Sequence, residues 1–492
     1  MNMGLSAELI DEIDATVNKV MQTWNVPGLA LAIVKDDQVI LSKGYGVREM
    51  GQPEKVDEHT LFAIGSNTKA FTATAVGLLV QEGILAWDDP VTKYIPSFQL
   101  HNSYAAQLMT IRDLLCHRGG LGTWAGDMLQ FSSYSLEEIV RRLRYIPPAY
   151  SFRAGYGYCN LMFITAELVI STVSGMSWDE FVRQRIFEPS GMQDSVTSPF
   201  FFGDRINIAT PHEDVKGKLQ TVNYRKDNHF GAAGAICSSI SDIATWMRLQ
   251  LNLGTLDGNR FVDEAIVEET HTPHTIMPLT PVEKKFFPSR RFSAYGLGWF
   301  LNETDGRFVV RHTGGVDGML SNVMMIPDRK IGIAVFSNKF PNAAYVAIPH
   351  YLTEKFLGLP ERNWIQMYVE LDDENKKKVH EAQKIKDASR AKDTHPSFDL
   401  EKYAGAYESD ILGGATLSLE GDALHIQLQA HTSISGTLEH WHYDTFECHW
   451  DDPVLGESLM PFLSDGQGNV TGFCVKFRED WIDPLEHVFR KK

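Results

Sequence analysis

The sequence predicts an α+β protein: an antiparallel sheet flanked by helices, with a helical subdomain, followed by a C-terminal all-β barrel domain. Strand-like apolar runs lie near both ends of the first 365 residues, and the stretch 105–260 between them is rich in helical patterns. A sheet built from both ends of a chain around inserted helices is an α+β arrangement. The last stretch, residues 397–492, alternates apolar and polar residues, which is typical of strands with one buried face.

Composition indicates a folded, acidic protein. The chain has 492 residues, of which 43% are hydrophobic and 11% aromatic, so wholesale disorder is excluded. Lys and Arg number 46 and Asp and Glu number 63, which gives a formal net charge of −17. Because an acidic surface repels phosphate backbones, nucleic acid is not expected as a partner.

Targeting signals and cysteine usage suggest a compartment. The first residues contain no basic region followed by an apolar run, and no stretch approaches about 18 apolar residues, so no membrane association is expected. The cysteines are odd in number and form no C-x-x-C pair: Cys116, Cys159, Cys237, Cys448 and Cys474. This usage suits a reducing compartment, so we expect a cytoplasmic protein.

The N-terminal elements follow from periodicity. Apolar residues three and four positions apart predict a helix over 7–24, capped by Ser6, with one buried face: Leu9, Ile13, Val17, Val20 and Trp24. Residues 29–35 and 38–47 flank the turn Asp36-Asp37 and predict a β-hairpin. The chain from 66 to 82 is almost entirely small or apolar after Lys69, which predicts a helix buried on most sides.

The remaining elements divide the chain. Helices are predicted over 111–117, 135–144, 160–173, 177–187 and 241–252, and strands over 307–312, 321–327 and 330–338. A highly charged stretch after Leu371 predicts a solvated helix or linker. Beyond it, apolar residues alternate on both sides of the turn Gly421-Asp422. We therefore expect domains over 1–365 and 397–492, joined by a charged linker over 366–396.

The first candidate motif is Ser66-x-x-Lys69. A helix that starts near Ser66 places Lys69 one turn on, facing the same way. A serine hydroxyl needs a nearby base, and a lysine amine can serve when burial lowers its pKa toward neutrality. The apolar run after Lys69 provides that burial. The alternative is a capping serine and an outward-facing lysine. Ser389 and Lys392 share the spacing but lie in the charged stretch, where nothing desolvates the lysine.

The second motif is Tyr158-Cys159-Asn160, the only Y-x-N in the chain, directly before a predicted helix. Its tyrosine could present a phenol to a cleft, with the phenol pKa lowered by a neighbouring ammonium, and its asparagine amide could hold both the lysine and a substrate carbonyl. A buried aromatic residue followed by a helix cap is the alternative. Cys159 is interpreted as packing.

The third motif is His312-Thr313-Gly314-Gly315, at the end of a predicted strand, where small residues allow a substrate backbone to approach. A purely structural histidine is the alternative. His117-Arg118-Gly119-Gly120 has a similar pattern, but its glycines follow a helix directly and are interpreted as a C-cap.

Together, in this order, the three motifs resemble those of the serine β-lactamase and penicillin-binding protein superfamily, S-x-x-K, Y-x-N and K-T-G or a variant. The Y-x-N form and flanking stretches such as LFAIGSNTKAFTA and HTGGVDGMLSNVMMIPDRK are most similar to the class C β-lactamase-related branch, over roughly residues 7–358. The resemblance implies a β-lactamase/transpeptidase-like sheet with a helical subdomain and no cofactor.

The resemblance also implies roles. Ser66 matches the nucleophile that forms an acyl-enzyme, Lys69 its deprotonating partner, and Tyr158 the general base and acid. Asn160 matches a side chain that contacts the lysine and the substrate amide, and the Ser66 and Gly315 N–H groups match the oxyanion hole. The third-motif positions that match substrate-binding residues are His312, Thr313 and Gly314.

His312 departs from the usual lysine of the third motif. A histidine is mostly neutral near pH 7, so it holds a β-lactam carboxylate less well. The H-x-G form occurs in D-aminopeptidases and esterases of this superfamily. We therefore expect a serine hydrolase acting on a small peptide with D-residues or on a carboxylic ester. A penicillin-binding sensor, a weak β-lactamase and an acyltransferase stay open as alternatives.

The C-terminal segment beginning FDLEKYAGAYES resembles the lipocalin-like barrel appended to some peptidases of this superfamily, where such barrels can reach the active-site entrance and join subunits. A homo-oligomer is therefore possible. His440, His442, Cys448 and His449 lie close in sequence but match no ligand pattern, so no metal is expected. The absence of G-x-S-x-G, H-E-x-x-H, Walker A and G-x-G-x-x-G motifs leaves an α/β-hydrolase, a zinc protease, an NTPase and a dinucleotide enzyme without support.

Overall fold

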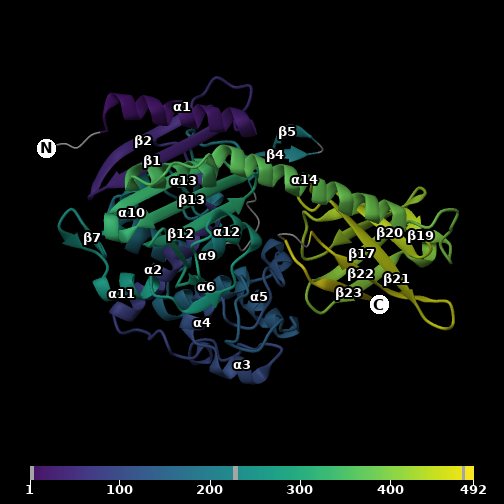
Figure 1. Cartoon of the computed structure of the whole chain (residues 1–492). Coiled ribbons are helices and arrows are strands. Elements are labelled where there is room, and N and C mark those ends of the chain that lie inside the picture. The colour runs from purple at the N-terminus through teal and green to yellow at the C-terminus, as the bar shows by residue number, and fades with distance from the viewer. Residues whose placement is uncertain (1–4, 216, 225–230, 479–481) are drawn as a thin grey trace.

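A computed structural model describes residues 5–215, 217–224, 231–478 and 482–492. It shows a sheet between layers of helices, a helical region beside it, and a barrel reached by one long helix (Figure 1). The predicted α+β class with a C-terminal all-β barrel is confirmed.

The central sheet has eight antiparallel strands in the order β2-β1-β14-β13-β12-β11-β10-β9. The predicted hairpin and the three late strands all belong to it: β1 (Gly28–Lys35), β2 (Gln38–Gly46), β9 (Thr275–Met277), β10 (Ser293–Tyr295), β11 (Phe300–Thr304), β12 (Arg307–Val316), β13 (Met319–Ile326) and β14 (Ile331–Ser337). The N-terminal strand β1 pairs with the late strand β14, so both ends of this region build one sheet, as predicted.

Helices cover both faces of the sheet, which explains why β1 is apolar almost throughout. Leu29, Leu31 and Ile33 of β1 pack on one side with α1 (Ala7–Trp24) and α13 (Ala344–Leu357). Ala30 and Ala32 pack on the other side with α2 (Thr68–Gln81) and α10 (Ile240–Leu251). Ser6 caps α1 by accepting a hydrogen bond from the Leu9 N–H at 3.2 Å, as predicted.

The helical region lies on the α2 side of the sheet (Figure 1). Its main helices have the following bounds: α3 (Ser103–Leu108), α4 (Ile111–Leu115), α5 (Leu136–Arg142), α6 (Asn160–Ser174), α7 (Trp178–Val182) and α9 (Gly231–Gly234). In the described ranges no single helix is long and apolar enough to cross a membrane. Only α6 and the segment Trp178–Ser190, taken together across a bend of 76°, reach that length and composition.

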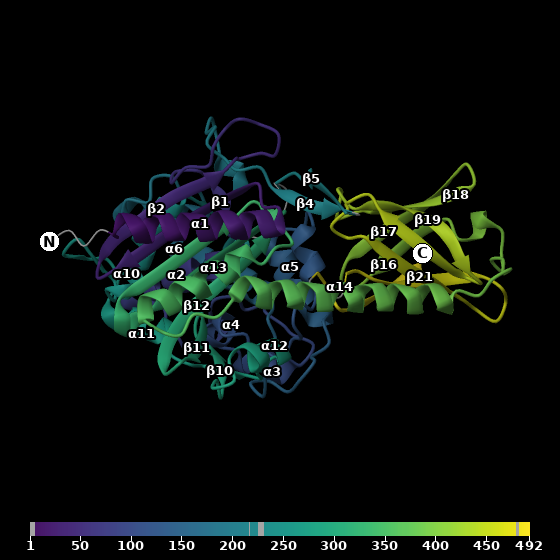
Figure 2. The same cartoon turned by 45° about the horizontal axis from the view of Figure 1, so that its top comes forward.

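The charged stretch forms one helix, α14 (Trp364–Ser389), which extends from the sheet to the barrel (Figure 2). Near its start, Asp372 accepts a hydrogen bond from the Trp24 indole of α1 at 2.5 Å. Near its end, Lys386 Nζ donates to Glu447 Oε1 of the barrel, also at 2.5 Å. The solvated helix that charge patterning suggested therefore contacts both parts of the protein.

The barrel is closed, and alternating inward-facing side chains fill it. Its eight strands are β16 (Gly405–Ser409), β17 (Gly413–Glu420), β18 (Ala423–Leu428), β19 (Ser435–His442), β20 (Thr445–Trp450), β21 (Glu457–Ser464), β22 (Val470–Lys476) and β23 (Glu486–Lys491). The predicted turn at Gly421-Asp422 joins β17 to β18, and Leu417 lies opposite Ile426 in the register.

The barrel also packs against the helical region. Arg142 of α5 donates to the carbonyl oxygens of Asp410 and Ile411, each at 2.9 Å. The Ser133 N–H donates to the Ala430 carbonyl at 2.6 Å. These contacts place the loops of the barrel beside α5, which packs against α6, the helix that begins with Asn160 of the second candidate motif.

Candidate active site

Ser66 lies in a single 3₁₀ turn, η1 (Gly65–Asn67), directly before α2. Gly65 has φ +52, and a Cβ there would lie 2.7 Å from the Gly315 nitrogen of β12, so only glycine lets η1 approach the sheet this closely. Asn67 Nδ2 donates to Ser321 Oγ of β13 at 2.8 Å. The sheet therefore fixes the position of Ser66.

Lys69 lies one turn after Ser66 and is fully buried, with 0% of the residue exposed. Its Nζ lies 3.1 Å from Ser66 Oγ, 2.6 Å from Asn160 Oδ1 and 2.6 Å from the Ala233 carbonyl oxygen. Burial lowers the pKa of Lys69 from 10.5 to about 7, against an opposing attraction from Asp127. The predicted desolvation of this lysine is present in the structure.

Three of the oxygens around Nζ are placed to exchange protons or N–H hydrogen bonds with it. The oxygens of Asn160 and Ala233 are amide-type oxygens, which can only accept, so each takes an N–H from Lys69. The Ser66 hydroxyl can instead donate its proton to the amine lone pair. When the amine is neutral, it can give its two N–H groups to these amide oxygens and accept the Ser66 proton on its lone pair, and when it is protonated it can donate to all three oxygens.

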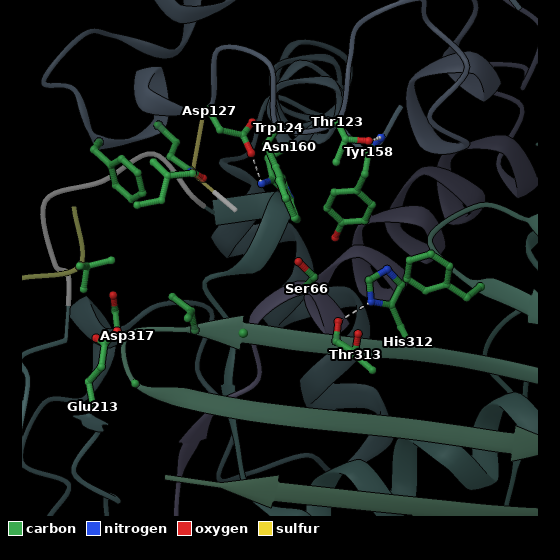
Figure 3. Close-up of a pocket in the computed structure, with 18 of the residues that line it drawn as sticks. Ser66, Thr123, Trp124, Asp127, Tyr158, Asn160, Glu213, His312, Thr313 and Asp317 are labelled. Atoms are coloured by element: carbon green, nitrogen blue, oxygen red, sulfur yellow. Dashed lines mark hydrogen bonds between the residues drawn. The ribbon is translucent and has the colours of Figure 1, made fainter. Parts of the chain in front are cut away.

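Tyr158 extends from the opposite wall with its phenol directed at Ser66 (Figure 3). Its ring centroid is 4.8 Å from Lys69 Nζ. Burial raises the pKa of the phenol well above 10, although a hydrogen bond with Ser66 opposes that effect. The predicted lowering of this pKa is wrong, because the neighbouring lysine is itself desolvated and offers no permanent positive charge.

Asn160 begins α6 and connects Lys69 to a carboxyl group. Its Oδ1 accepts from Lys69, and its Nδ2 donates to Asp127 Oδ2 at 2.6 Å, which fixes the orientation of the amide. Asp127, in the turn η3 (Asp127–Phe131), is 1% exposed. Burial and the nearby Asp483 of the barrel raise the pKa of Asp127 from 3.8 to about 8. Sequence reasoning missed Asp127, because no spacing rule relates it to Asn160.

The third motif lies on β12 beside Ser66. His312 is 1% exposed, and burial lowers its pKa to about 3, so the ring is neutral. One ring nitrogen lies 2.9 Å from the Tyr295 hydroxyl and the other 2.7 Å from the Thr313 carbonyl oxygen. Gly314 faces η1 rather than the cavity: a Cβ there would lie 1.9 Å from the Ile64 carbonyl oxygen.

A cavity of about 380 Å³ opens above Ser66, within the range of small-ligand sites (Figure 3). Its wall includes most of the predicted site residues: Ser66, Tyr158, Asn160, His312, Thr313 and Gly315. Lys69 and Gly314 do not line it, because Lys69 is fully buried and Gly314 faces η1. The far wall carries Glu213 and Asp317, and the barrel contributes Val454 and Ile482. Nothing in the sequence pattern indicated these barrel residues individually.

The interpretation of His117 changes. Helix α4 ends at Leu115, and His117 is fully buried with its ring centroid 4.4 Å from that of Tyr158. The glycines that follow His117 therefore do not cap α4, as the sequence suggested. His117 instead packs behind the second motif.

The histidines and cysteine near the end of the chain do not gather into one site. His449 lies with Glu447 and Glu457, whose ligand atoms fall within 4.8 Å of one another. The Lys386 ammonium already contacts Glu447 there. His442 instead accepts a hydrogen bond from the Ala391 N–H at 3.1 Å.

Two known protein families match parts of this sequence. Residues 13–355 match the family model described as Beta-lactamase. The chain belongs to the β-lactamase family. This is a family of serine hydrolases, and the match covers the sheet, the helical region and all three motifs. Residues 389–486 match a second model, described as a domain of unknown function (DUF3471), which covers most of the barrel.

Similar proteins match this chain over about two thirds or more of its length. A protein of Aspergillus violaceofuscus, named unguisins hydrolase ungD, is 29% identical over 482 residues, covering 90% of this chain and 83% of its own length. The octameric penicillin-binding protein homologue of Pyrococcus abyssi superimposes with a TM-score of 0.65 at 21% identity, covering 98% of this chain and 99% of that one. A D-stereospecific amidohydrolase of Streptomyces gives 0.55 at 22% identity, covering 66% and 94%. The resemblance to the β-lactamase and penicillin-binding protein superfamily is thus confirmed.

Proposed function

We propose that this protein hydrolyses amide or ester bonds through an acyl-enzyme on Ser66. The observation that supports this most strongly is the fully buried Lys69 Nζ, 3.1 Å from Ser66 Oγ, with two amide oxygens taking its N–H groups. A lone pair is thereby directed at the hydroxyl proton, which is the geometry of a general base.

In the proposed acylation, Ser66 Oγ attacks the substrate carbonyl carbon, and its proton passes to Lys69 Nζ. The raised pKa of Tyr158 keeps its phenol protonated, so it donates a proton to the leaving amine or alcohol and regains one from the Lys69 ammonium. Water then attacks the ester carbonyl by the reverse route, releasing the acid and restoring Ser66.

The substrate-side groups are proposed on their place in the site. The N–H groups of Ser66 and Gly315 lie where η1 meets β12 and would hold the oxyanion, and removal of one such donor typically costs about 10²–10³ in rate. Asn160 and the third-motif residues His312 and Thr313 would orient the substrate, whereas Gly314, expected from the motif to do so, packs against η1 and has no proposed contact with the substrate. We further propose the division into a catalytic domain over 1–365, a connecting segment over 366–396 and a barrel domain over 397–492.

The proposed substrate is a small peptide with D-residues or a carboxylic ester. The neutral His312 favours these over β-lactams, because it offers no positive charge to a ring carboxylate. The names of a hydrolase and of a D-stereospecific amidohydrolase among the similar proteins suggest peptides as the first substrates to try. Self-association is proposed from the octameric homologue and can be measured by sedimentation.

The test is labelling with a fluorophosphonate probe, with the modified residue mapped by mass spectrometry. Ser66 should be labelled, and Ser66→Ala should abolish both labelling and turnover. A panel of p-nitrophenyl esters, D- and L-aminoacyl p-nitroanilides and nitrocefin then separates esterase, peptidase and β-lactamase activity, and added alcohols or amines reveal acyl transfer. Full activity in Ser66→Ala would refute the mechanism.

A further inference from the structure

His117 lies beside the segment that carries Tyr158, although the two are far apart in the sequence. The chain leaves α4 at Leu115 and turns so that His117 adopts φ +57, a left-handed conformation that is unfavourable for most residues other than glycine. The residue is fully buried, with 0% exposed. Such strain persists only where surrounding contacts impose it, and it concentrates at functional sites.

Two hydrogen bonds to His117 bracket Tyr158. The carbonyl oxygen of His117 accepts from the Gly157 N–H at 3.0 Å. Its ring Nδ1 accepts from the Cys159 N–H at 3.1 Å. The residues on either side of Tyr158 are thus held by a single side chain and its own backbone, and the His117 ring packs on the Tyr158 ring at a centroid distance of 4.4 Å.

His117 Nδ1 stays a hydrogen-bond acceptor across the neutral pH range. A ring nitrogen that accepts an N–H carries no proton, so the neutral ring has its hydrogen on Nε2. Burial, together with the positive charges of Lys69 and His312 when they are protonated, lowers the pKa of His117 well below 6.5. His117 thus holds the Cys159 N–H in one fixed arrangement throughout the neutral pH range.

We propose that His117 is a positioning residue for Tyr158: its carbonyl oxygen holds the Gly157 N–H, its Nδ1 holds the Cys159 N–H, and the Nδ1 contact is needed to aim the phenol at Ser66. This inference rests on the proposed function, in which that phenol moves a proton. A misplacement of about 1 Å at a reacting group can cost roughly 10²-fold in rate. Because the Tyr158 N–H also donates to Thr123 Oγ1 at 3.1 Å, the segment should loosen rather than unfold when His117 is changed.

Two substitutions distinguish the effect of the hydrogen-bond acceptor from the effect of ring packing. His117→Phe keeps an aromatic ring beside Tyr158 but removes the acceptor. His117→Asn keeps an oxygen acceptor and tolerates a left-handed backbone. With p-nitrophenyl acetate as substrate, His117→Phe should lower kcat by about 10- to 100-fold with little change in KM. His117→Asn should recover most of that loss.

The chain offers a matched control in His212. It is also 0% exposed, and its Nε2 accepts the Met50 N–H at 3.1 Å, a bond of the same kind and length. His212→Phe also removes the Nδ1 hydrogen bond to the Asn338 carbonyl oxygen at 2.9 Å, so this control loses at least as many ring hydrogen bonds as His117→Phe. His212 does not line the cavity, and His212→Phe should keep the wild-type kcat. Thermal melts report folding for every variant, and His117→Leu replaces His117→Phe if the latter does not fold.

A double substitution distinguishes this inference from the proposed function. In a Tyr158→Phe background, His117→Phe should cause no further loss of residual activity, because the group it positions is gone. The inference is overturned if His117→Phe retains wild-type kcat or if His117→Asn is as impaired as His117→Phe. It is also overturned if His117→Phe lowers kcat by the same factor in the Tyr158→Phe background as in the wild type. Wild-type activity in Tyr158→Phe alone would instead overturn the proposed role of the phenol.

Discussion

The burial of Lys69 makes a prediction that can be worked through in numbers. An ordinary lysine with a pKa of 10.5 would be neutral in only about 0.03% of molecules at pH 7. With the pKa lowered to about 7, roughly half of the molecules hold a neutral amine. The fold therefore raises the amount of available base about 10³-fold at pH 7.

The assay is the pH dependence of kcat/KM between pH 5 and 9, for the wild type and for Lys69→Met. In the wild type, kcat/KM should rise about tenfold per pH unit below pH 7 and level off above it. Lys69→Met keeps a similar volume but has no base, so it should lose about 10²–10⁴ in rate and show no such rise. A flat wild-type profile from pH 5 to 8 would refute the assignment of Lys69 as the base.

The same substitution has a predicted effect on stability. Between pH 7 and 10.5 the unfolded chain holds a proton on Lys69 that the folded chain has lost, so wild-type stability rises with pH relative to Lys69→Met. At 1.36 kcal/mol per pH unit, the full change is on the order of 5 kcal/mol. Urea unfolding of both proteins at pH 7, 8 and 9 measures the part of this change that falls between pH 7 and 9, which is about 2 kcal/mol. Parallel stability curves would contradict the buried, depressed lysine.

Two further predictions concern packing around the site. In Gly314→Ala the new Cβ would lie 1.9 Å from the Ile64 carbonyl oxygen, and the variant should lose at least about 1–3 kcal/mol of stability by thermal melt. Gly315→Ala, whose Cβ meets only a methyl group at 3.2 Å, should melt near the wild type, and equal melting of the pair would contradict this packing. Asp483→Ala removes the acceptor for N–H groups on both sides of Asp127, so kcat should fall although the change is in the barrel. An unchanged kcat would show that the barrel does not position Asp127.

Much of the fold follows from local patterns. The four- and three-residue spacing of apolar residues in 7–24 specifies a helix with one buried face, and the alternation around Gly421 specifies a hairpin, since both depend only on neighbouring side chains. The Ser66–Lys69 spacing is likewise local, because one helical turn brings the two side chains together whatever surrounds them. These features were predicted without a structure.

Other features depend on segments that no local rule connects. The Asp127 carboxyl meets the Asn160 amide because a loop and a helix pack together, and Asp483 reaches the same place from the barrel. The sequence predicted a helix end at His117 because Gly119 and Gly120 follow it closely. In the structure His117 instead contacts Tyr158 and Cys159. The direction of the Tyr158 pKa shift was mistaken for the same reason, since segments distant in the sequence bury the phenol and so raise its pKa.

The sequence by itself determined the N-terminal helix and hairpin, the main middle helices, the three late strands, the α+β class and the three motifs, because hydrophobic periodicity and short spacings are properties of neighbouring residues. Only the tertiary structure decided which motif residues meet, which carbonyl oxygens receive the Lys69 N–H groups, and how far each titratable group is removed from water. Those quantities are set by atoms from segments that lie between 33 and 357 residues apart along the chain, so they exist only once the chain has folded.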